Sequence, residues 1–162
     1  MKAKLTHALS IAVLLVVGIH IAHAQVTTDY DRFKDETTIK LEKTLVAGDK
    51  DDGIYILISC TWSGRTNDKR ANAVLSLFSV SPTTHFEYDR ELIFLVDGVR
   101  VRLGQMMLVD VKQGAEWLML PIPRADLDRL SKGKTVEAKV GDREFSLTPK
   151  QIAALRDFLS KT

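Results

Sequence analysis

Cys60 is the only cysteine of this chain, and His85 is the only histidine beyond its first 24 residues. A cysteine becomes a nucleophile when a neighbouring imidazole lowers the pKa of its thiol. Cys60, however, lies in an alternating apolar run between Ile58 and Trp62, which is typical of a buried strand. We therefore expect Cys60 to be a core residue. A hydrolase that uses Cys60, or Asp and Glu residues, is kept as an alternative function.

Acidic residues are harder to interpret, because sequence does not show which carboxylates converge in space. Glu87, Asp89 and Glu91 alternate and would share one face of a strand, which favours a solvated edge over a glycosidase-like pair. The loop Asp49–Gly53 lacks the acid and the glycine that a calcium loop requires at its fifth and sixth positions. Zinc sites need several His or Cys ligands. We expect neither a metal nor a cofactor.

Five basic residues are candidate ligand-binding groups. Arg65, Lys69 and Arg70 lie in the polar loop 63–72, and Arg100 and Arg102 alternate in a later strand. The fork of an arginine side chain suits phosphate or carboxylate groups, so a small anionic ligand is one expected partner. An unknown protein is the other, because a secreted enzyme inhibitor would present the loop 63–72 to its target.

The N-terminal segment has the three parts of a secretory signal peptide. Lys2 and Lys4 form a basic start, an apolar run of about a dozen residues follows, and Ala22 and Ala24 make an Ala-x-Ala site. The run is too short for a membrane span of roughly 20 residues. We expect residues 1–24 to be removed and the mature chain to be periplasmic or extracellular.

Charge arithmetic changes when this segment is removed. The 162 residues carry a formal net charge of +2, but cleavage would leave 138 residues with 21 basic and 21 acidic side chains. A nucleic-acid partner would need a clustered basic excess, which this balance does not provide. A single cysteine allows no disulfide within one chain, so stability must come from packing.

Hydrophobic patterning predicts an α+β fold that is rich in β-structure. After an N-terminal arm at residues 25–36, residues 37–162 form one domain of seven to eight mostly antiparallel strands, as a sandwich-like or strongly curved sheet. Strands 105–111 and 116–122 are apolar on both faces, which indicates central, covered strands. A short helix at 124–132 ends at Gly133, and a C-terminal helix packs on the sheet.

Local turn and cap signals predict two hairpins and one helix start. Asp97-Gly98 is a preferred two-residue hairpin turn, and its register pairs Arg100 with Leu95 on the face opposite the apolar core. A second hairpin at 136–147 sets Lys139 across from Glu144. Thr148-Pro149-Lys150-Gln151 is a capping box for the last helix.

Three of these segments support a resemblance. The stretch Tyr30–Ile39 after a signal peptide, the Leu95-Val96-Asp97-Gly98 hairpin, and the tail Val136–Gly141 leading to Phe145-Ser146-Leu147 and a helix resemble a group of small exported bacterial proteins without an assigned function. The resemblance covers nearly the whole mature chain and implies a bacterial exported domain. We therefore expect a soluble, non-enzymatic binding or structural domain at the cell envelope.

Overall fold

The computed structural model describes residues 25–66, 72–112 and 114–162, so the expected signal peptide lies outside it. Within these ranges the chain forms ten strands and two helices. The elements are β1 (Val26–Asp31), β2 (Glu36–Gly48), β3 (Gly53–Ser63), β4 (Ala73–Val80), β5 (Glu91–Val96), β6 (Val99–Gln105), β7 (Met107–Lys112), β8 (Ala115–Ile122), α1 (Arg124–Lys132), β9 (Val136–Val140), β10 (Arg143–Ser146) and α2 (Pro149–Lys161).

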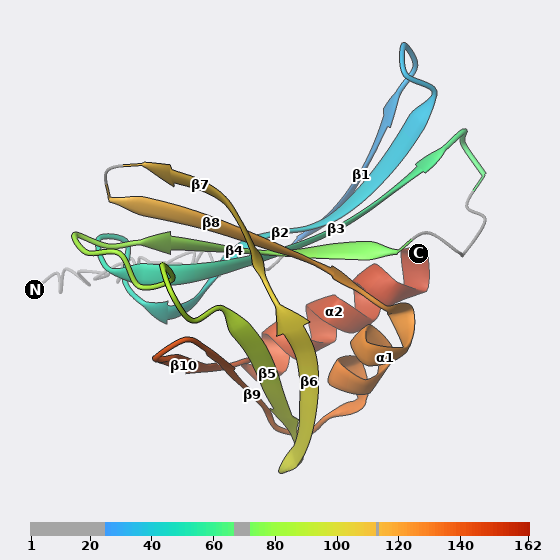
Figure 1. Cartoon of the computed structure of the whole chain (residues 1–162). Coiled ribbons are helices and arrows are strands. Elements are labelled where there is room, and N and C mark those ends of the chain that lie inside the picture. The colour runs from blue at the N-terminus through green and yellow to red at the C-terminus, as the bar shows by residue number, and fades with distance from the viewer. Residues whose placement is uncertain (1–24, 67–71, 113) are drawn as a thin grey trace, which may run out of the picture.

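The strands form two antiparallel sheets. The larger sheet has the order β1-β2-β3-β4-β8-β7, and the smaller has the order β10-β9-β5-β6. The four-stranded sheet and both helices lie against the same face of the six-stranded sheet (Figure 1). The predicted β-rich α+β class, with a C-terminal helix packed on a sheet, is confirmed.

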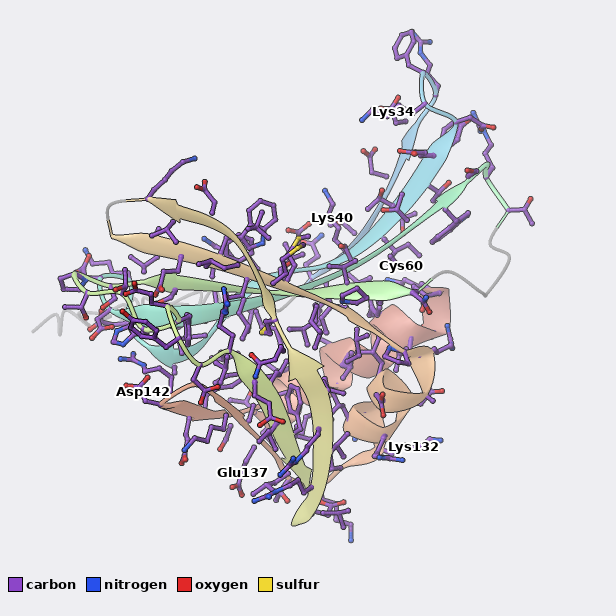
Figure 2. All side chains as sticks on the ribbon, in the orientation of Figure 1. Lys34, Lys40, Cys60, Lys132, Glu137 and Asp142 are labelled. Carbon is purple, nitrogen blue, oxygen red and sulfur yellow. The ribbon has the colours of Figure 1, made fainter. Side chains whose placement is uncertain are left out.

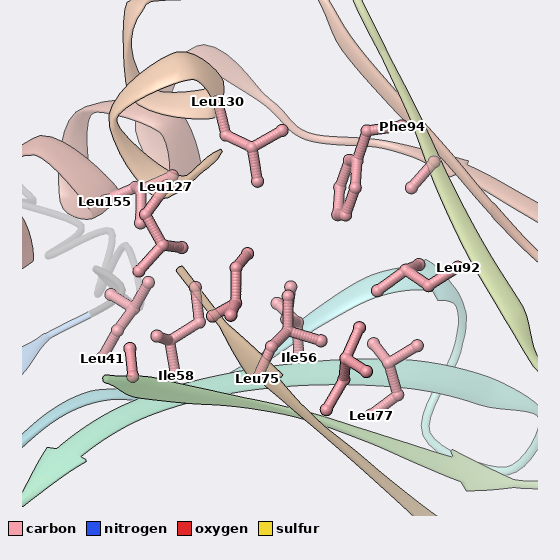
Figure 3. Packing of buried hydrophobic residues seen from close by; sticks show 14 of the residues in the cluster. Leu41, Ile56, Ile58, Leu75, Leu77, Leu92, Phe94, Leu127, Leu130 and Leu155 are labelled. Atoms are coloured by element: carbon pink, nitrogen blue, oxygen red, sulfur yellow. The ribbon is translucent and has the colours of Figure 1, made fainter. Parts of the chain in front are cut away.

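The hydrophobic core fills the space between the six-stranded sheet and the layer beneath it. Figure 3 shows Leu75 and Leu77 of the large sheet facing Leu155 of α2 and Leu92 and Phe94 of the small sheet. All five side chains are buried. Full burial of such a side chain contributes roughly 1.5–3 kcal/mol, so this layer contact supplies the stability that a disulfide would otherwise add.

The N-terminal arm is a strand rather than a loose segment. β1 pairs with β2 from Val26 opposite Leu41 to Asp31 opposite Glu36, and it forms one edge of the large sheet. The tip of this hairpin, residues 32–35, projects away from the layer of helices (Figure 1). Asp31 fixes the tip, because its carboxylate accepts the backbone N–H groups of Phe33 and Lys34 at 2.9 and 3.3 Å.

Both predicted hairpins have the expected register near their turns. Val96 lies opposite Val99 and Leu95 opposite Arg100, while Lys139 lies opposite Glu144. Farther from the first turn a bulge between Leu92 and Ile93 shifts the pairing, so Leu92 meets Gly104 and not Leu103. A bulge adds one residue to one strand and increases the local twist.

The prediction that 105–111 is a central, covered strand is wrong. β7 forms the outer edge of the large sheet, and its side chains Met107, Val109 and Val111 are exposed. The chain passes directly from β6 in one sheet to β7 in the other through the buried Met106. Met106 is buried where the chain changes sheets, but the apolar side chains on the outward face of β7 are left exposed, so an apolar run on both faces does not mean here that both faces are covered.

A row of three aromatic side chains crosses the outer face of the large sheet. Tyr55, Phe78 and Trp117 lie opposite one another on β3, β4 and β8. Phe78 and Trp117 stack with ring centroids 5.5 Å apart, and the Lys43 ammonium lies 4.6 Å from the Tyr55 ring centroid. Stacked rings and the cation shield one another, which explains apolar groups on an outward face.

The helix ends agree with the sequence signals but not always for the expected reason. The Thr148–Gln151 capping box is present at the start of α2. Gly133 follows α1, yet its φ is −61°, so a left-handed turn is not why a glycine stands there. A Cβ atom at residue 133 would lie 2.8 Å from Val96 Cγ1 and 3.0 Å from Val136 Cγ2. Lack of space explains this glycine.

Gly133→Ala should therefore lower the free energy of unfolding by about 1–3 kcal/mol, because the added methyl group displaces a stiff valine. The backbone at residue 133 suits alanine, and without the clash the change would stabilise the protein by about 0.4–1 kcal/mol. Chemical denaturation measures whether the free energy of unfolding falls or rises. The loss should shrink in a Val96→Ala background, and an equal loss in both backgrounds would contradict this explanation.

Candidate ligand-binding site

Cys60 and His85 lie far apart, so they do not form a nucleophilic pair. Cys60 is 3% exposed and lies opposite Ala73 at one end of β4. His85 is held at the other end of β4, where its Nε2 lies 3.0 Å from Ser81 Oγ. The ends of β4 are seven residue-to-residue steps apart, a distance of roughly 23 Å at about 3.3 Å per step. The prediction that Cys60 is a core residue is confirmed.

The contact between Ser81 and His85 was not expected from the sequence. The Arg143 guanidinium lies 3.5 Å from the same His85 Nε2, and it also pairs with Asp52 at 3.3 Å. Ser81 is buried. The polar side chains of Ser81, His85, Arg143 and Asp52 thus pair with one another. Their contacts connect the loop between β4 and β5 to β10 of the small sheet. The only feature of the sequence that could have indicated this contact is the spacing of four positions between Ser81 and His85.

A buried carboxylate holds the same loop from the other side. Glu116 is 4% exposed, and its two oxygens accept the backbone N–H groups of His85 and Phe86, each at 2.9 Å. Hydrogen bonds to a charged acceptor are the stronger kind, and they offset the cost of burying the carboxylate. Glu116 therefore positions the chain where it crosses from one sheet to the other.

Of the other acidic candidates, Asp89 and Asp49 have structural roles. Glu87 and Asp89 lie in the loop before β5 and not on a strand face, and Asp89 accepts the backbone N–H of Glu91 at 3.1 Å. The Asp49 carboxylate accepts the backbone N–H groups of Asp51 and Asp52, which hold its pKa below the ordinary value. Within the described ranges, no cluster of three or more His, Cys, Asp or Glu residues could hold a metal ion.

The candidate basic residues do not gather in one place. Arg65 lies two residues after the end of β3, where its guanidinium is 4.3 Å from the centroid of the Tyr30 ring in the projecting hairpin. Arg100 and Arg102 lie on β6 of the small sheet, at the opposite side of the molecule (Figure 1). Lys69 and Arg70 fall outside the described residues.

Arg100 borders an open groove of about 410 Å³ on the outward face of the small sheet. Two rows of side chains cross this face. One row is Ser146, Glu137, Leu95 and Arg100, and the other is Glu144, Lys139, Ile93 and Arg102. All of these except Arg102 line the groove, together with Ala138 and Phe145. Glu137 marks this face in the lower part of Figure 2.

Some of the charged side chains in the groove form ion pairs and others do not. Lys139 lies 3.2 Å from Glu144, and outside the groove Arg102 lies 3.9 Å from Glu91. The side chains of Arg100 and Glu137, in contrast, form no ion pair and no side-chain hydrogen bond with any other described residue. Ile93 and Leu95, which are half-buried, form an apolar floor between them. The groove therefore offers one unpaired cation and one unpaired anion on either side of an apolar strip.

Asp97 fixes the hairpin that carries Arg100. It has a φ of 50° in the β5–β6 turn, and its carboxylate accepts the backbone N–H groups of Lys134 and Thr135, each at 2.9 Å. The Thr135 N–H is the main reason that the pKa of Asp97 lies below its ordinary value of 3.8. The hydrogen bonds join the turn to the segment that follows α1.

Comparison of the chain with family models, curated proteins and solved structures gave no match. Neither of the described helices is long and apolar enough to cross a membrane. The groove and the other surfaces of this chain therefore provide the indications of its function.

The role of Asp97 predicts a specific loss of stability in acid. Because its folded-state pKa is lowered, ionised Asp97 contributes fully above pH 3.8, and the contribution is lost as the pH falls below 3.8 through the folded-state pKa. Asp97→Asn keeps an oxygen acceptor and tolerates a positive φ. Wild type should be more stable than this variant near neutral pH, and the difference should shrink in acid. Urea titrations across this range measure it, and a constant difference would refute the assignment.

Proposed function

We propose that this chain is an exported, non-enzymatic binding domain of the bacterial cell envelope, and that the groove binds a small organic anion with an apolar part. Export is supported by the basic and apolar N-terminal segment with its Ala-x-Ala site. A bacterial envelope location is supported by the resemblance to small exported bacterial proteins.

The observation that carries the proposal is the unpaired Arg100 at the border of the groove. Arginine presents a planar fork of donors that matches carboxylate and phosphate groups. The groove volume of about 410 Å³ lies within the usual range of small-molecule sites. Ile93 and Leu95 add apolar surface beside the arginine, so a ligand with both an anionic and an apolar group fits better than an inorganic anion.

A rigid binding surface is consistent with these residues. Every groove side chain belongs to a paired strand, and the hairpin that carries Arg100 is anchored through Asp97. The separation of buried Cys60 from His85 removes the thiol–imidazole version of the hydrolase alternative. These facts favour binding over nucleophilic catalysis.

A second candidate function, inhibition of a partner enzyme, is favoured by the projecting hairpin. Phe33 at its tip is 86% exposed, and the guanidinium of Arg32 lies 4.7 Å from its ring centroid. Gly64, the second residue of the proposed inhibitory loop 63–72, donates its backbone N–H to the Asp35 carbonyl in this tip. An aromatic side chain on a fixed, protruding turn suits insertion into a partner's pocket.

Arg100→Gln should weaken the binding of N-acetyl-leucylglycine, a probe with one carboxylate and an apolar side chain, by about tenfold, since a hydrogen bond to a charged group contributes about 1.5 kcal/mol. NMR titration of the mature chain measures the dissociation constant. Arg102→Gln is the matched control, because Arg102 lies in the next row outside the groove. Equal losses in both variants, or no saturable binding by wild type, would refute the proposal.

The inhibitor candidate predicts that the mature chain at micromolar concentration inhibits at least one member of a protease panel. Phe33→Ala should then weaken inhibition by about thirtyfold or more, as expected for an interface residue that contributes at least 2 kcal/mol. Tyr88→Ala, which removes an equally exposed ring far from the tip in sequence, should leave inhibition unchanged. Absence of inhibition across the panel would end this candidate.

A further inference from the structure

The groove has an unpaired negative charge as well as an unpaired positive one. Glu137 lies on β9, opposite Leu95 of β5, and Leu95 in turn lies opposite Arg100 of β6. Glu137 is exposed and makes no ion pair with another described residue. The neighbouring pair Lys139–Glu144, at 3.2 Å, neutralises itself. A ligand that carried only an anion would therefore meet Arg100 and leave Glu137 unmatched.

We infer that the groove binds a zwitterion, with the anionic group on Arg100, an ammonium group on Glu137 and an apolar side chain over Leu95. The inference rests on the proposed function and specifies the ligand class for the same site. Short peptides and amino acids are the common molecules with this chemistry. Each charge of such a ligand faces an opposite charge of the protein, and neither is repelled by an unpaired like charge.

The spacing of the strands favours a ligand longer than a single amino acid. Neighbouring strands lie about 4.8 Å apart, so the backbones that carry Arg100 and Glu137 are separated by roughly 10 Å. A dipeptide spans about 7 Å between its termini, and the two side chains can lean toward each other across the remainder. The ligand also needs an apolar group between its charges to cover Leu95, which a phosphoethanolamine headgroup lacks.

Three related probes test this inference. Leucylglycine has both charges, N-acetyl-leucylglycine lacks the ammonium group, and leucylglycinamide lacks the carboxylate. NMR titration of the mature chain should give the lowest dissociation constant for leucylglycine, by about fivefold relative to N-acetyl-leucylglycine, as for one exposed ion pair, and by about tenfold relative to leucylglycinamide, which lacks the carboxylate that Arg100 binds. Chemical-shift changes should centre on Leu95, Arg100 and Glu137.

Charge-removing variants link each group of the ligand to one side chain. Glu137→Gln should weaken leucylglycine about fivefold but should not weaken N-acetyl-leucylglycine, which has no ammonium group. Arg100→Gln should weaken both of these probes and should not weaken leucylglycinamide. Because Arg100 and Glu137 are exposed, thermal unfolding of both variants should match wild type, which separates loss of binding from loss of fold.

The outcomes distinguish a failure of the zwitterion inference from a failure of the anion-binding function. If N-acetyl-leucylglycine binds through Arg100 and leucylglycine binds no more tightly, the anion-binding function stands and the zwitterion inference is overturned. If no probe gives saturable shifts at the groove, both are overturned. If Glu137→Gln weakens the two carboxylate probes equally, Glu137 does not contact an ammonium group, and the inference fails.

Discussion

Burial of one face of the six-stranded sheet is the constraint on which the rest of the structure depends. That face is covered partly by the two helices and partly by the four-stranded sheet (Figure 3). The smaller sheet can cover it only because its own inward side chains, such as Leu92 and Phe94, are apolar. Its outward face is then left to solvent, and this is where the groove lies.

The sequence predicts most of the local structure because the relevant forces are local. Asp97-Gly98 requires a tight turn, and Thr148 with Gln151 caps a helix, whatever lies nearby. The position of β7 at an edge could not be predicted, because it depends on which strand lies beside β8. An apolar run on both faces favours burial on two sides, but it does not distinguish a covered strand from an edge strand such as β7, whose Met107, Val109 and Val111 are exposed.

The candidate site was predictable only in part for the same reason. The position of Arg100 opposite Leu95 could be predicted from the register of the hairpin turn. Glu137 was not, because its position beside Leu95 depends on the pairing of β5 with β9, two strands that are distant in sequence. Ser81 and His85 are only four positions apart, yet their contact was not predictable either, because the loop geometry that joins them depends on the buried Glu116, which is distant in sequence.

The alternation of inward and outward side chains along β5 determines both the core and the groove. Along β5, Leu92, Phe94 and Val96 face inward, and Ile93 and Leu95 face outward. A shift of one residue in the pairing would expose the first set and bury the second, together with the charges opposite them. The cost of exposing Phe94 therefore also keeps Leu95 between Arg100 and Glu137. The same packing energy that selects the fold thus holds the two unpaired charges at a fixed separation, which a loop-borne site would not do.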